Sequence, residues 1–101
     1  MSIDELAALI LTQTRDVLAR KGYDSQIPGE KVEVIPGPKY TKIDRGPEHN
    51  MSGFLMVENE TGIIYGIKGY GRPHKQHVYG TLATAGDWYW GEYGPRKLAS
   101  V

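Results

Sequence analysis

The apolar residues near the start of the chain recur at the spacing of one helix face. They are Ile3, Leu6, Leu9 or Ile10, Val17 and Leu18. Ser2 and Glu5 have the residue types and the spacing of a capping box, and Gly22 suits the left-handed conformation that often ends a helix. The pattern therefore predicts an amphipathic helix over residues 2–21, whose apolar face needs a partner surface.

The rest of the chain consists of short β-prone segments separated by glycine and proline. The segments are 32–35, 39–44, 53–58, 63–70 and 77–82, with 88–93 as a weaker sixth. Residues 45–52 and 69–76 have the composition of loops. We expect a single α+β domain over residues 1–101, in which the N-terminal helix packs on a twisted antiparallel sheet of four to six strands (about 32–93), either open or curled into a small barrel.

The segment Asn59–Gly62 has the composition of a tight turn that is closed by glycine. The strands on either side of it should therefore form a hairpin. If Asn59 lies opposite Ile63, Leu55, Val57, Tyr65 and Ile67 face the helix, and Phe54, opposite an exposed Lys68, lies on the face left for a ligand or a subunit.

Composition narrows the function classes. The 101 residues carry 12 basic and 12 acidic side chains and no cysteine. A formal charge of zero argues against tight nonspecific DNA binding, and the lack of cysteine excludes disulfides and thiol nucleophiles. The longest apolar run, Leu6–Leu11, is far shorter than the ~20 residues that cross a bilayer, so we expect no membrane association and an intracellular location.

One long segment departs from this balance. Residues 61–86 contain no acid but include three basic side chains, several tyrosines and two histidines. Tyrosine rings stack on bases and cations attract phosphates, so the segment predicts a surface for single-stranded nucleic acid or a nucleotide-like anion. The alternative is that these tyrosines are ordinary half-buried strand residues. The candidate ligand-binding residues are Tyr40, Lys42, Lys68, Tyr70, Arg72, His74, Lys75, His77 and Tyr79.

The spacing of His74 and His77 raises the question of a metal site. Both rings reach one ion if the segment forms a helical turn, whereas in an extended strand they point to opposite faces. A third ligand such as His49 or Asp87 would also be needed. We therefore expect no metal, no cofactor and no catalytic residue, and an enzymatic role would require a carboxylate beside one of these histidines.

A second hypothesis concerns the aromatic residues near the C-terminus. Trp88 and Trp90 either close the end of the core or form a hydrophobic interface. In the second case the chain is a protein-interaction or virion-structural protein, such as an inhibitor of a host factor or a homo-oligomer.

Four stretches, residues 39–43, 56–59, 62–71 and 77–82, resemble a group of small uncharacterised proteins encoded by tailed bacteriophages of actinobacteria. The likeness covers roughly residues 1–93. It implies a phage origin, expression in the host cytoplasm and an accessory role on host or phage macromolecules. No activity is assigned to that group, so the resemblance transfers no catalytic residue.

Overall fold

The computed structural model describes residues 1–98, apart from the side chain of Tyr70, and begins with helix α1 (Ile3–Arg20). The backbone N–H of Glu5 donates to the Ser2 hydroxyl at 3.1 Å, and the Ser2 N–H donates to the Glu5 carboxylate at 3.0 Å. This capping box satisfies two of the free N–H groups at the helix start. Gly22 follows the helix with a φ of +80°. The predicted helix and both of its end signals are confirmed.

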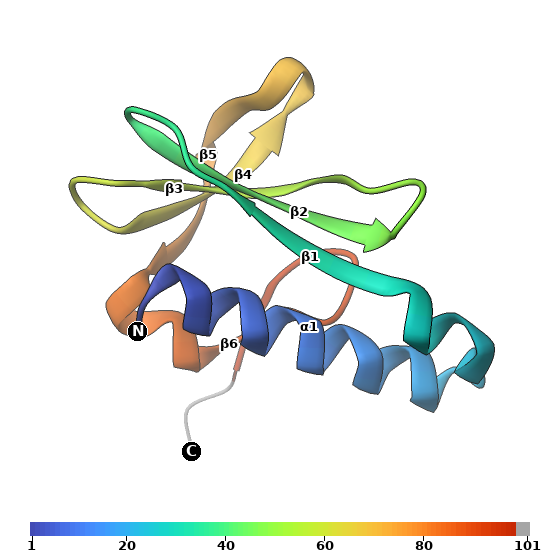
Figure 1. Cartoon of the computed structure of the whole chain (residues 1–101). Helices are drawn as coiled ribbons and strands as arrows, with labels where there is room; N and C mark the ends of the chain where they lie inside the picture. The colour runs from blue at the N-terminus through green and yellow to red at the C-terminus, as the bar shows by residue number, and fades with distance from the viewer. Residues whose placement is uncertain (99–101) are drawn as a thin grey trace.

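Five antiparallel strands form the main sheet in the order β1-β2-β3-β4-β5, and α1 lies against one of its faces (Figure 1). The strands are β1 (Glu30–Ile35), β2 (Tyr40–Pro47), β3 (Ser52–Glu58), β4 (Ile63–Lys68) and β5 (Arg72–Thr81). The α+β prediction is confirmed, and the sheet stays open rather than closing into a barrel. Within residues 1–98, no helix has the length and apolar character that crossing a bilayer requires.

The remaining elements are short. Three 3-10 helices lie between these elements: η1 (Asp24–Gly29) joins α1 to β1, η2 (Gly69–Gly71) joins β4 to β5, and η3 (Leu82–Asp87) follows β5. Strands β6 (Trp88–Tyr89) and β7 (Arg96–Lys97) form a separate two-stranded sheet. The predicted strand 88–93 is therefore mostly a loop. The prediction of a loop over residues 69–76 was also wrong, because residues 72–76 belong to strand β5. This strand lies at the edge of the sheet, where Pro73 is tolerated.

The β3–β4 hairpin forms as predicted, but its register differs by one residue. The Gly62 N–H donates to the Glu58 carbonyl at 2.8 Å, and Gly62 has a φ of +74°. Asn59 thus belongs to the turn, and Val57 pairs with Ile64. Ile64 therefore lies in the core in place of Tyr65, which pairs with Met56 on the other face. Lys68 is exposed as expected, at the far end of β4.

The core lies between α1, the sheet and the C-terminal segment. Its fully buried side chains are Leu6, Ile10, Ile43, Leu55, Val57, Ile64, Ala85 and Trp90. The Trp90 indole N–H donates to the Ala85 carbonyl at 3.0 Å, which satisfies its one polar atom. Trp90 has an exposed fraction of 0%, so its side chain is unavailable to a partner, and of the two predicted interface residues Trp88 alone reaches the surface.

Trp90→Ala should lower the free energy of unfolding by about 3–5 kcal/mol, because it leaves a large cavity in the core. Trp88→Ala is the matched control and should cost clearly less, since Trp88 is only half-buried. Urea denaturation followed by far-ultraviolet circular dichroism measures both values. Equal losses for the two variants would contradict this assignment of the core.

Candidate functional site

A groove opens on the helix-bearing face of the sheet, where β3 and β4 stop pairing. Their last pair at this end is Leu55 with Gly66, and the tip of β4 and β5 rises away from the other strands and from α1 (Figure 1). The groove has a volume of about 470 Å³, and none of the residues that line it is acidic. We call it the histidine groove. Its walls include Arg45, Phe54, Gly66, His74, His77, Tyr79 and the loop 93–95.

The two histidines of the groove lie with their rings stacked. The ring centroids are 3.9 Å apart and the planes differ by 1°. A regular strand would place residues three apart on opposite faces. Here His74 pairs with Gly66 and Val78 with Tyr65, so three residues of β5 bulge out between neighbouring positions of β4. The bulge turns both imidazoles to the same side, an outcome that the sequence did not predict.

The stacked geometry bears on metal binding. An imidazole binds a metal ion through a nitrogen lone pair that lies in the plane of its ring. Two parallel rings have no common plane, so this pair cannot coordinate one ion without rotation of a ring. Within residues 1–98, no group of three or more His, Cys, Asp or Glu side chains is placed to hold a metal ion.

The surroundings of His74 favour its neutral form. Its Nδ1 is buried and has no hydrogen-bond partner in the described structure. Burial lowers the pKa of His74 below its ordinary value of 6.5, and the neighbouring His77 and Lys68 lower it further. With no acid in the lining, the groove offers a protonated imidazole no carboxylate.

Tyr79 supplies a hydroxyl beside the histidines. A Cβ at Gly66 would lie 3.3 Å from the His77 Cβ and 3.4 Å from the Tyr79 hydroxyl oxygen, so glycine lets both side chains lie close over β4. The Tyr79 ring packs edge-on against Trp88 and Trp90, with centroids 5.6 and 6.3 Å away. Burial raises the pKa of Tyr79, so its hydroxyl remains a hydrogen-bond donor at neutral pH.

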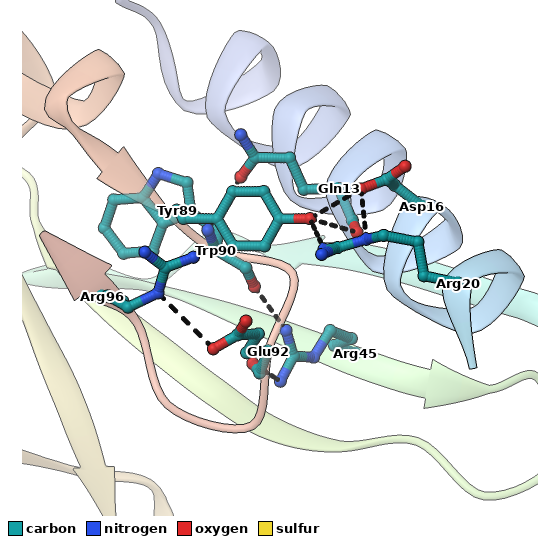
Figure 2. A network of polar contacts seen from close by, with 8 residues as sticks. All are labelled: Gln13, Asp16, Arg20, Arg45, Tyr89, Trp90, Glu92 and Arg96. Atoms are coloured by element: carbon teal, nitrogen blue, oxygen red, sulfur yellow. Dashed lines mark hydrogen bonds and ion pairs between the residues drawn. The ribbon is translucent and has the colours of Figure 1, made fainter. Parts of the chain in front are cut away.

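Arg45 holds the C-terminal segment that leads into the groove-lining loop 93–95. Figure 2 shows its guanidinium reaching two backbone carbonyls of the C-terminal segment, that of Trp90 at 2.6 Å and that of Glu92 at 3.0 Å. The same guanidinium lies 3.6 Å from the centroid of the Phe54 ring. A bulge between β2 and β3 at Phe54 places this ring beside Arg45. Burial lowers the pKa of Arg45 and the Glu30 carboxylate opposes that effect, but an arginine remains charged at neutral pH.

Helix α1 fixes the same segment from the other side (Figure 2). The backbone N–H of Trp90 donates to the Gln13 side-chain oxygen at 2.7 Å. The Tyr89 hydroxyl donates to the Asp16 carboxylate at 2.9 Å and accepts from Arg20 at 2.6 Å. Gly91 passes so close to the helix that a Cβ there would overlap the Gln13 carbonyl. The helix and β2 therefore both fix residues 89–92, which lead directly into the loop 93–95.

The candidate residues of the sequence analysis divide between the two faces of the sheet. His74, His77 and Tyr79 line the histidine groove. Tyr40 lies on the other face, where its ring meets Tyr65 edge-on at 6.2 Å and the Lys75 ammonium lies 5.9 Å from its centroid. The pKa of Lys75 is raised, mainly because the Tyr40 side chain offers its ammonium a hydrogen bond.

The other predicted cations lie near the end of the sheet. Lys42 is 3.3 Å from the Asp44 carboxylate. Together with Lys68 it lines a smaller pocket of about 250 Å³, which shares Gly53 and Ile67 with the histidine groove. Arg72 is exposed at the start of β5. The Tyr70 side chain lies outside the described part of the structure.

Two residues of the groove were missed by the sequence analysis. Arg45 lies at the edge of a segment that has the composition of a loop, and its partners are more than forty residues away in the chain. Tyr93 is the second, and its side chain is 99% exposed at the rim of the groove. No signal within the local sequence pattern identifies either one as part of a site.

Comparisons with known proteins found no match among protein-family models, curated proteins or solved structures. The resemblance to phage-encoded proteins therefore stays a prediction.

Arg45→Lys should lower the free energy of unfolding by about 1–3 kcal/mol, because a lysine cannot donate to both carbonyls in the geometry of a guanidinium. Arg72→Lys is the matched control, since Arg72 is exposed on β5 and should tolerate the change. Urea denaturation measures both. An unchanged stability in Arg45→Lys would show that the C-terminal segment does not depend on this contact.

The pKa of His74 should be below its ordinary value in a titration followed by nuclear magnetic resonance of the imidazole protons. His77→Ala should raise it, because the variant removes a like charge, whereas His49→Ala in a distant loop should not change it. The folded state binds fewer protons than the unfolded chain between the lowered and the ordinary pKa. The contribution of His74 to stability is therefore complete above the ordinary value and is lost as the pH falls through this window.

Proposed function

We propose that this protein is a non-catalytic binding module that holds a nucleotide-like anion or a short single strand of nucleic acid in the histidine groove. The observation that carries the proposal is the composition of the groove wall. The wall combines the imidazoles of His74 and His77, the hydroxyl of the half-buried Tyr79 and the exposed ring of Tyr93. It includes no acidic residue. We also propose, from the sequence resemblance, that the protein is a phage accessory protein of the host cytoplasm.

The size of the groove supports a small ligand. Pockets for small molecules usually have volumes of about 300–1,000 Å³, and about 470 Å³ lies within that range. The Tyr93 ring at the rim is free to stack on a base, which is a contact that every base can make. The histidines and the Tyr79 hydroxyl supply hydrogen-bond donors along the groove wall.

The electrostatics of the region also support an anion. Lys42 and Lys68 line the smaller pocket on the other side of the gap between β3 and β4. The lining of neither pocket includes an Asp or a Glu. Asp44 pairs with Lys42 from outside the two linings, so the exposed Lys68 is the cation of the smaller pocket that is better placed to attract an anion.

A second candidate function, an interaction with another protein, is favoured by the edge of the sheet. Strand β5 is ten residues long and lies at the end of the strand order, with Val78 47% exposed. An exposed edge strand can pair with a strand of a partner. In that case Tyr93 and Trp88 would contact the partner, and the basic residues would only add solubility.

Tyr93→Ala should weaken the binding of nucleoside monophosphates or short oligonucleotides roughly tenfold, since stacking of one base contributes about 1–3 kcal/mol. Tyr23→Ala is the matched control, because Tyr23 is an exposed tyrosine at the far end of α1. Isothermal titration calorimetry at low and at physiological salt measures the affinities, which should fall as the salt concentration rises.

Absence of binding to every nucleotide and oligonucleotide at low salt would contradict the nucleic-acid proposal. Recovery of a stable complex with a second protein, lost on Tyr93→Ala but not on Tyr23→Ala, would favour the protein-interaction function instead.

A further inference from the structure

We propose that the histidine groove takes a phosphate monoester as its dianion, and that the His74–His77 pair takes up a proton when the ligand binds. This inference rests on the proposed function, because it specifies which anion enters the groove and how its binding is coupled to pH.

The stacked rings disfavour the protonation of both histidines at the same time. At a centroid distance of 3.9 Å, two imidazolium ions would repel each other strongly. The Nδ1 of His74 is buried without a hydrogen-bond partner, and burial, His77 and Lys68 together outweigh the backbone contact that favours its protonation. The pair is thus a coupled site, in which the proton on one ring opposes a proton on the other.

The groups that face the pair do not favour its protonation. Arg45 lines the groove from β2, and Lys68 at the end of β4 is close enough to lower the pKa of His74. Tyr79 and Tyr93 add hydroxyls to the lining, and burial raises the pKa of Tyr79, so that hydroxyl carries no charge at neutral pH. With no carboxylate in the lining, the compensating negative charge has to come from a ligand.

An anion in the groove supplies that charge. It stabilises the imidazolium form, and by linkage protonation of the pair strengthens the binding of the anion by the same free energy. The affinity should therefore rise as the pH falls, by up to about tenfold per pH unit for each proton taken up. Proton uptake by the pair therefore depends on the charge of the ligand.

The charge of the ligand separates a nucleotide from a polynucleotide. A terminal phosphate monoester has a charge between −1.5 and −2 near neutral pH, roughly twice that of a backbone phosphodiester. The two stacked imidazoles and Arg45 line the same groove, so the groups that can carry positive charge are gathered in one place rather than along a track. This arrangement favours one doubly charged group over a line of single charges.

The first experiment measures the affinity for sulfate, which remains a dianion, from about pH 8 to about pH 6 across the ordinary titration range of histidine. Nuclear magnetic resonance follows the imidazole protons of the full chain during the same titration. Sulfate should bind at least tenfold more tightly at the lower pH and should raise the pKa of the pair. The double variant His74→Gln/His77→Gln should abolish the pH dependence, because glutamine donates hydrogen bonds but does not titrate, whereas His49→Gln should retain it.

The second experiment compares adenosine monophosphate with cyclic adenosine monophosphate, a diester, and with adenosine. The monoester should bind at least tenfold more tightly than either. If the monoester and the cyclic diester bind equally well, or if sulfate binding and the imidazole signals do not respond to pH while the nucleotides still bind, the proton-coupled inference is overturned and the proposed function stands. If adenosine binds as tightly as both nucleotides, the groove does not recognise the anion and the proposed function fails as well. If neither nucleotides, oligonucleotides nor sulfate bind at any pH, the proposed function fails with it.

Discussion

The contact on which the rest of this structure depends is that of the Arg45 guanidinium with the C-terminal segment. One side chain of β2 donates to the carbonyls of Trp90 and Glu92 and lies over the Phe54 ring. Backbone carbonyls that leave water need donors, and a guanidinium provides several in one plane. The contact sets the position of Trp90 in the core and of the loop that closes one side of the histidine groove.

The groove itself results from irregular strand pairing. A bulge at Phe54, a three-residue bulge before Val78 and the early end of the β3–β4 ladder all occur at the same end of the sheet. Each one leaves backbone groups unpaired and redirects side chains, and sheet irregularities of this kind are common near functional sites. A regular sheet would have placed His74 and His77 on opposite faces and left no opening between β3 and β4.

The distribution of charge follows from the same geometry. The acid-free segment predicted one continuous aromatic and basic surface, but the strand register and the bulge of β5 send Tyr40 and Lys75 to one face and Tyr79 with the two histidines to the other. Residues that are neighbours in the sequence are therefore divided, and Arg45 and Tyr93, far apart in the sequence, join the groove. Strand register, which composition does not specify, decides which of these residues meet.

The sequence alone determined the features that depend on a few neighbouring residues. The capping box of Ser2 and Glu5, the glycine after α1 and the turn at Gly62 are all as expected, because each rests on bonds within one turn of the chain. Tertiary structure decided the face on which Ile64 lies, the burial of Trp90, the stacking of the histidines and the role of Arg45. These features depend on packing and hydrogen bonding between segments far apart in the chain, where a one-residue change of register exchanges the two faces of a strand.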